Sequence, residues 1–245
     1  MGYKYELHTH NRIGSKCGAF TPEELVETFL GQGYTGICTT DHFFNGNTAA
    51  PGPEHEWKYR VEKFCEGYEK VKVEGDKRGL DVFFGFEYTV PHKGSDVNSN
   101  AGCDFLVFGI DMEWLINNGG DVATVSTNEY LNRCRAAGGT VIQAHPFRLA
   151  AGYMNHMCLF PQCVDGVEVL NGNPNTMGAP NKMAEHYADY YGFFKTAGTD
   201  IHSADKPLLA VTELPDRALD VFHMMRQLRE GKQKLYFKKN ELYLN

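Results

Sequence analysis

The sequence contains no long apolar segment and no cysteine pair of the kind that binds zinc or forms a redox site. No run approaches the roughly 18 apolar residues of a membrane-spanning helix, and no basic segment followed by an apolar stretch opens the chain. The seven cysteines are dispersed, and none forms a C-x-x-C pair. We therefore expect a cytoplasmic protein with no leader, whose thiols are reduced and mostly buried.

Positive charge is also scarce, since the formal net charge is −7. Proteins that bind nucleic acids or membrane surfaces usually present a basic face, so neither is expected as a partner. A small substrate, including an anionic one, is compatible with this charge. With 245 residues, of which 42% are hydrophobic, the chain is long enough for one sizeable core and short for two full-sized domains. We expect a single domain over residues 1–245, and nothing indicates the oligomeric state.

Short strand-like runs alternate with helical patterns, which is typical of an α/β domain with mostly parallel strands. The helix that follows the first strand has a clear start, because Thr21, Pro22 and Glu24 form a capping box with proline at the first helical position. The predicted strands are 3–10, 36–40, 81–89, 105–110, 140–144, 166–170 and 193–198. Further helices are predicted near 54–78, 127–137, 179–191 and 217–230, followed by a β-like tail over 234–244.

Potential metal ligands stand where these strands end. His8 and His10 are two apart on one strand, so both imidazoles point the same way. Four other strand ends carry further donors: Asp41 and His42, Glu87, His145, and Asp200 and His202. In barrels the C-terminal ends of the strands build the active site, so this pattern predicts a metal centre. Mixed imidazole and carboxylate ligands suit Zn²⁺, Mn²⁺ or Fe²⁺, and two or three such ions are expected.

The individual residues differ in what they indicate. Glu87 follows the apolar run 82–86, where a carboxylate is costly to bury without a cation. Asp41 is expected to orient a ligand histidine rather than to bind metal itself. The remaining histidines lie away from the strand ends, and ordinary surface or packing roles are expected for them: His55, His92, His156, His186 and His223.

Taken in order, these motifs resemble the PHP (polymerase and histidinol phosphatase) family of metal-dependent phosphoesterases over nearly the whole chain. The segments that carry the resemblance are His8-Thr9-His10, 21–25, Thr40-Asp41-His42, Gly85-Phe86-Glu87, Ala144-His145-Pro146, 168–171 and 198–202. The resemblance implies a distorted (β/α)7 barrel with up to three metal ions at the C-terminal face of its strands. By position, the first ion would be held by His8, His10, Glu87 and Asp200. Glu87 would bridge to a second ion on His145, and His42 and His202 would hold a third. Glu168 and Asn171 would support the pocket.

The sequence departs from the family pattern at two places. Asp104 stands where family members commonly have a histidine ligand, and an aspartate can also bind a hard divalent ion. The loop after His10 often supplies a histidine or aspartate to the third ion, whereas this chain has Lys16 there. A protonated lysine cannot serve as a ligand and repels a nearby cation, so a weak or partly occupied third site is expected.

The resemblance implies phosphoester hydrolysis by a metal-bridging hydroxide, and we expect a small phosphomonoester as the substrate. His202 or His42, if free of a third ion, would protonate the leaving oxygen. Arg148, with Lys93 and Lys16, would bind the phosphate, although an ordinary surface salt bridge is an equally favoured interpretation of Arg148. Two alternatives stay open: a metal-dependent amide or carboxylic-ester hydrolase, and a non-catalytic regulatory module that kept the barrel.

Overall fold

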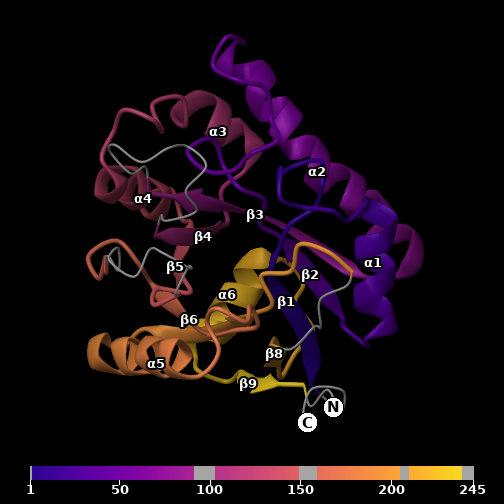
Figure 1. Ribbon diagram of the computed structural model, residues 1–245, viewed down its shortest axis with the longest axis vertical. Coiled ribbons are helices and arrows are strands. Elements are labelled where there is room, and N and C mark those ends of the chain that lie inside the picture. Colours follow the sequence, from indigo (N-terminus) through magenta and orange to yellow (C-terminus); the bar gives the residue numbers. More distant parts are fainter. Residues whose placement is uncertain (1, 91–102, 149–158, 205–209, 239–245) are drawn as a thin grey trace.

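A computed structural model describes residues 2–90, 103–148, 159–204 and 210–238 (Figure 1). Within these residues one curled sheet has nine strands in the order β7-β6-β5-β4-β3-β2-β1-β8-β9. The strands are β1 (Tyr3–Thr9), β2 (Gly36–Thr39), β3 (Asp81–Thr89), β4 (Asp104–Phe108), β5 (Thr140–Ala144), β6 (Gly166–Asn171), β7 (Phe194–Gly198), β8 (Ala210–Leu214) and β9 (Lys234–Phe237). The helices are α1 (Pro22–Gly31), α2 (Trp57–Arg78), α3 (Met112–Asn118), α4 (Thr127–Ala136), α5 (Ala179–Tyr191) and α6 (Val221–Arg229).

The two sides of the sheet approach each other and form a nearly closed barrel. The Thr212 hydroxyl on β8 accepts a hydrogen bond from the backbone N–H of Ala197 on β7 (3.0 Å) and donates one to its carbonyl (2.8 Å). Nearer the rim, Thr9 and Ile201 form a parallel β-bridge. The strand ends that carry the predicted ligands are thereby brought around one opening.

Two strands, β4 and β8, run antiparallel to both of their neighbours, and β4 lies among the strands that carry the predicted ligands. The predicted strands were expected to be mostly parallel, and β1, β2, β3, β5, β6 and β7 do share one direction, whereas β4 pairs antiparallel with both β3 and β5. Asp104 begins β4 and lies opposite Thr89 and Ala144, which end their strands. The reversal therefore places the first residue of β4 at the rim where the other strands finish.

Most predicted elements are present with small shifts at their ends, and the capping box at Thr21 and Glu24 is confirmed. Two elements, α3 and β8, were not predicted from the sequence. The N-cap of α3 is Asp111, whose side chain accepts a hydrogen bond from the backbone N–H of Trp114. The final helix is shorter than the predicted 217–230, since it begins after the N-cap Asp220. Residues 239–244 of the predicted tail lie outside the described residues.

Helices cover the outside of the sheet and also close one of its ends. In Figure 1, α1 and α2 lie to one side of the barrel, while α3, α4 and α5 lie to the other. Helix α6 crosses the centre of this view, and its Met224 and Leu228 pack in one cluster with Leu106, Phe108 and Ile142. Burial of these side chains gives the barrel an apolar floor opposite the rim that bears the ligands.

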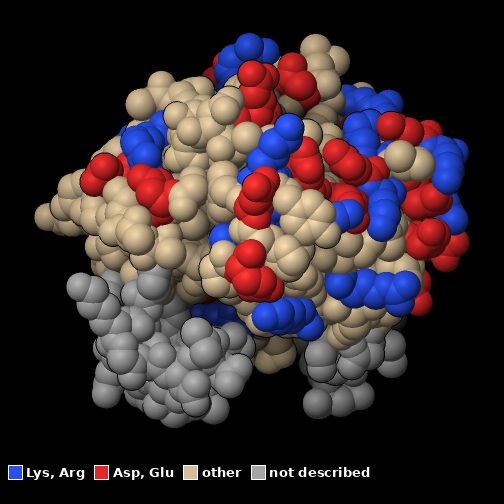
Figure 2. Space-filling model, turned by 90° about the horizontal axis from the view of Figure 1, so that it is seen from above, with Lys and Arg blue, Asp and Glu red and all other residues tan. Residues whose placement is uncertain are grey.

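The outer faces carry both signs of charge. Figure 2 shows basic and acidic side chains intermixed on one face of the molecule. On α2 several of them pair along the helix, for example Lys72 with Asp76 and Lys77 with Glu74. Among the described residues, no helix is long and apolar enough to cross a membrane.

Candidate metal centre

Glu87, near the end of β3, lies at the middle of a group of imidazoles. Its carboxylate oxygens are 2.8 Å from His42 Nδ1, 3.3 Å from His8 Nε2, 3.4 Å from His10 Nε2 and 3.5 Å from His145 Nε2. The Glu87 side chain is only 1% exposed, and it follows the apolar residues 82–86 of the same strand. The structure thus brings Glu87 together with four of the histidines predicted as ligands, which come from the ends of β1 and β5 and from the segment after β2.

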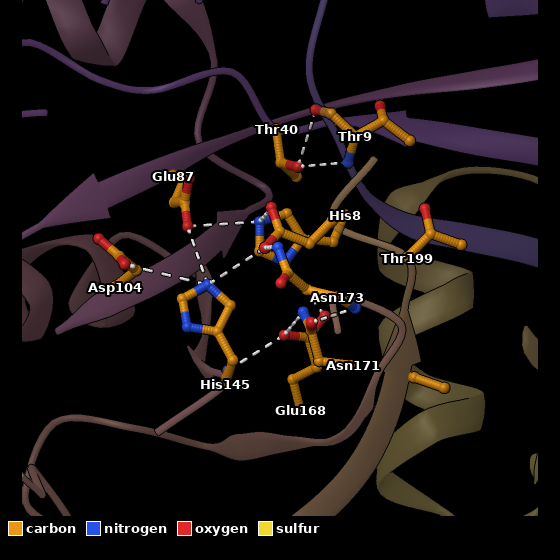
Figure 3. A network of polar contacts seen from close by, with 12 residues as sticks. His8, Thr9, Thr40, Glu87, Asp104, His145, Glu168, Asn171, Asn173 and Thr199 are labelled. Carbon is orange, nitrogen blue, oxygen red and sulfur yellow. Dashed lines mark hydrogen bonds and ion pairs between the residues drawn. The ribbon is translucent and has the colours of Figure 1, made fainter. Parts of the chain in front are cut away.

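Two further carboxylates complete this group, and Figure 3 shows one of them, Asp104, beside His145. One Asp200 oxygen lies 3.5 Å from His8 Nε2 and 3.4 Å from His10 Nε2. Asp104 lies 3.9 Å from His145 Nε2, as the reversed β4 allows. His145 and Asp200 have positive φ angles of 27° and 52°, which are costly for residues with side chains and cluster at functional sites. The backbone bends at both points to aim a ligand inward.

Hydrogen bonds on the far side of each ring determine which nitrogen faces the group. His8 Nδ1 is 3.1 Å from a Glu168 oxygen, and His202 Nδ1 is 2.9 Å from the backbone carbonyl of Asp200. Because a carboxylate and a carbonyl only accept, both Nδ1 atoms carry the proton. The Nε2 lone pairs are therefore free, as metal ligation requires.

His10 is held in the same way through a hydroxyl. Ser15 donates its proton to Asp41 at 2.7 Å, so its oxygen accepts from His10 Nδ1 at 3.1 Å. The same oxygen accepts from the backbone N–H of His42. Asp41 also accepts from the backbone N–H of Asn11. Its carboxylate thus supports the loop and orients His10 through Ser15, which is the orienting role expected from the sequence.

Whether the site fits a metal ion can be judged from the hydrogen bonding of the histidine Nε2 atoms. Nε2 of His8, His10 and His145 is buried and has no hydrogen-bond partner among the described residues. Each of these lone pairs instead faces carboxylate oxygens at 3.3–4.0 Å. Buried lone pairs that face one another without a proton or a cation are unfavourable. Divalent ions would satisfy both sides, so the donor set fits metal.

The electrostatics show the same need for positive charge. Burial alone would lower the pKa of His8, but the Glu168, Asp200 and Glu87 carboxylates raise it well above its usual value. Burial raises the pKa of Asp104 to about 6, and the neighbouring charge of Glu87 contributes to this rise. Carboxylates crowded in this way are stabilised when a cation lies among them.

Glu168 on β6 supports the group from below. It accepts hydrogen bonds from the backbone N–H of His145 (3.0 Å) and from Asn171 Nδ2 (2.9 Å), in addition to the contact with His8. Figure 3 shows Glu168 and Asn171 below His8 and to one side of His145. This arrangement agrees with the supporting role expected for both residues.

Cys17 belongs to the candidate metal centre, although the sequence did not predict it as a ligand. One donor atom from each of His10, Cys17, His42 and His202 lies within 4.8 Å of the others. Cys38, Cys65, Cys134 and Cys163 are buried as expected, but Cys17 is partly exposed and belongs to this cluster. Lys16, in contrast, is exposed at the surface. One feature of the sequence could have indicated Cys17: it stands one residue after Lys16, in the loop where the PHP family often supplies a ligand.

The remaining candidates are divided between the rim and the surface. Arg148 Nη1 lies 3.3 Å from Asp200 and its side chain is 24% exposed, so a cation borders the group. Lys93, His92 and His156 lie outside the described residues. His55 and His186 are exposed and His223 is partly exposed, and none of the three belongs to the donor groups of the metal centre.

Several solved structures resemble this one in fold. A two-domain protein containing a predicted PHP-like metal-dependent phosphoesterase, from Bacteroides vulgatus, matches with a TM-score of 0.64 and 14% identity. The match covers 97% of this chain and 65% of that protein, so the chain spans about two thirds of its length. The chain has a PHP-like fold. The sequence matches no protein-family model, and the comparison with curated proteins found no match.

Two other solved structures are similar to this chain in fold. A candidate metal-dependent phosphoesterase from Bifidobacterium adolescentis matches with a TM-score of 0.52 and 17% identity, over 93% of this chain and 96% of that one. An amidohydrolase from Chromobacterium violaceum, solved with bound sulfate and no metal, matches with a TM-score of 0.56 and 16% identity, over 94% and 97%. At such identities the likeness concerns the fold, and the site of this PHP-like barrel must be judged from its own residues.

Proposed function

We propose that this protein is a metal-dependent phosphoesterase that hydrolyses a small phosphomonoester at the rim of the barrel. The observation that carries the proposal is the position of Glu87, with four imidazole nitrogens within 3.5 Å of its carboxylate. A single carboxylate in this position can bridge two ions. The chemistry that such ions supply when bound is Lewis acidity and activation of water at neutral pH.

The donors separate into groups that would each hold one ion. His8, His10 and Asp200 form one group, and Glu87, Asp104 and His145 form another, each with donor atoms within 4.8 Å. Asp104 takes the place of the family's usual histidine, which makes the second group richer in oxygen and compatible with Mn²⁺ or Fe²⁺ as well as Zn²⁺.

Arg148 is the residue that favours a phosphoester over an amide. Its guanidinium lies beside Asp200 and is accessible from the rim, and a planar fork of donors matches the oxygens of a phosphate. The amidohydrolase among the structural neighbours keeps amide hydrolysis as the competing activity. An amide substrate gains little from this cation, whereas a phosphate dianion gains a charge-assisted contact.

The test is elemental analysis of the purified protein followed by a substrate screen with each bound metal. Phosphomonoesters should turn over faster than phosphodiesters, amides or carboxylic esters, and a chelator should abolish turnover. Arg148→Lys should raise KM for the phosphomonoester while the metal content stays unchanged. Faster hydrolysis of an amide, or activity that survives complete removal of metal, would contradict the proposal.

A further inference from the structure

The thiol of Cys17 lies at the rim, in the loop after β1, where backbone hydrogen bonds hold the neighbouring residues in place. The backbone N–H of Lys16 donates to Asn47 (3.0 Å), and that of Gly18 donates to Ser15 (3.2 Å). The next residue, Ala19, donates to the carbonyl of His202 (2.7 Å). Hydrogen bonds on both sides of Cys17 therefore fix its backbone, and one of them ties the loop to the segment that carries His202.

A glycine next to Cys17 makes this path possible. A Cβ atom at Gly18 would lie 2.5 Å from the backbone carbon and oxygen of Asn11, which is closer than real Cβ atoms approach. The loop can fold back on its own beginning only because residue 18 has no side chain. This close return points Cys17 toward the histidines and leaves Lys16 at the surface.

Three imidazoles surround the thiol. The rings of His10 and His202 stack at 4.3 Å between centroids, and those of His10 and His42 at 4.5 Å. His10 is fully buried, and its Nε2 has no hydrogen-bond partner among the described residues. A cysteine that serves as a nucleophile needs one neighbouring base, whereas three imidazoles around one sulfur form a ligand set for a thiophilic ion.

We infer that Cys17, with His42 and His202, forms a third metal site that prefers a soft ion such as Zn²⁺ or Cd²⁺. Donors of one tetrahedral ion are separated by about 3.5 Å when the bonds measure about 2.0–2.3 Å. The present donors lie within 4.8 Å of one another, so small side-chain rotations bring them to an ion. The expectation of a weak third site rested on Lys16, and Cys17 supplies the missing ligand.

The third site has three protein ligands of its own. His10 Nε2 has one lone pair and already lies 3.4 Å from both Glu87 and Asp200, which assigns it to the first group. Three ligands and an open position are the arrangement of catalytic rather than structural zinc sites. His42 and His202 are then ligands rather than proton donors. This inference deepens the proposed function and rests on it for the neighbouring ions.

Titration of metal-free protein with Co²⁺ under a thiol-free reductant tests the site directly. We expect three bound ions per chain and a near-ultraviolet sulfur-to-cobalt charge-transfer band. Cys17→Ser should lose the band and one ion, while thermal unfolding of the metal-free variant confirms that it is folded. Cys103→Ser is the matched control, because Cys103 is also partly exposed and precedes Asp104. This variant should keep both the charge-transfer band and all three ions.

Cys17→Asp separates sulfur ligation from a structural effect of the substitution. It should recover the third ion without the band, and its preference for Cd²⁺ over Mn²⁺ should fall by roughly tenfold or more. Two bound ions and no sulfur band in the unaltered protein would overturn the third site and leave the proposed function standing. No bound ion at all would overturn both.

Discussion

Glu168→Gln is the substitution that best tests how the metal ligands are oriented. Glu168 is fully buried and accepts three hydrogen bonds, from the His145 backbone and Asn171 at one oxygen and from His8 at the other. Glutamine offers one accepting oxygen and one donating amide. If its oxygen faces His8, two buried donors lose their acceptor, at about 1–3 kcal/mol each.

The opposite amide orientation is therefore favoured, with the oxygen toward His145 and Asn171. The amide nitrogen then faces His8 Nδ1, so the imidazole must move its proton to Nε2, which is the atom 3.3 Å from Glu87. Changes of this kind next to a ligand weaken metal binding by about 10–100-fold, or about 1.4–2.7 kcal/mol. The fold should survive, because the hydrogen bonds to the His145 backbone and Asn171 remain.

Competition with a chromophoric chelator measures the affinity, and thermal unfolding of the metal-free protein reports the fold. The matched control is Glu185→Gln, the same chemical change on the exposed face of α5, which should bind metal as the unaltered protein does. Unchanged affinity in folded Glu168→Gln would refute the orienting role. Complete loss of one ion would also refute it, because it would make Glu168 a direct ligand.

Three other substitutions probe the centre and its surroundings. Glu87→Gln should lose bound metal and activity together, and elemental analysis that finds full stoichiometry would rule out the bridging role. Burial raises the pKa of Glu6 to about 8 against hydrogen bonds from the N–H groups of Thr199 and His8, whereas the unfolded carboxyl titrates near 4.5. As the pH rises from about 4.5 to about 8, the unfolded state releases the Glu6 proton before the folded state does, so the metal-free protein should lose up to about 5 kcal/mol of its free energy of unfolding. Denaturant unfolding of Glu6→Gln at several pH values should lack this dependence on pH. Gly198→Ala would put a Cβ 2.4 Å from a Glu168 oxygen and should destabilise by about 1–3 kcal/mol in calorimetry, whereas Gly31→Ala, which meets nothing within 4 Å, should not.

The sequence was sufficient for the parts of the site that depend on local pattern. An apolar run followed by Glu87, or a His-x-His pair at a strand end, places a donor at the rim whatever the rest of the chain does, because strand ends share one edge in a barrel. The structure brings these residues together as predicted. The same local pattern located the capping box of α1.

Asp104 and Cys17 depend instead on contacts between distant segments. Asp104 reaches the rim at the start of a strand, and only its antiparallel pairing with β3 and β5 shows that this start is at the correct end. Cys17 is positioned by the backbone hydrogen bonds of its neighbours, from Lys16 to Asn47 and from Ala19 to His202. No periodicity records such contacts, and a dispersed cysteine is more often a buried apolar side chain.

The exposure of the histidines has a kinetic consequence. His8 and His10 are 0% exposed and His145 is 3% exposed, whereas His42 and His202 are 15% and 26% exposed. Because α6 packs at the opposite end of the barrel, ions would reach the deep ligands from the rim, where His42 and His202 are the more exposed histidines. Loading would then be ordered, with the inner pair filling before the Cys17 position covers it. Exchange with free metal would be fast at the rim and slow beneath it, so the outer ion would follow the metal supply of its surroundings while the inner pair stays as first assembled.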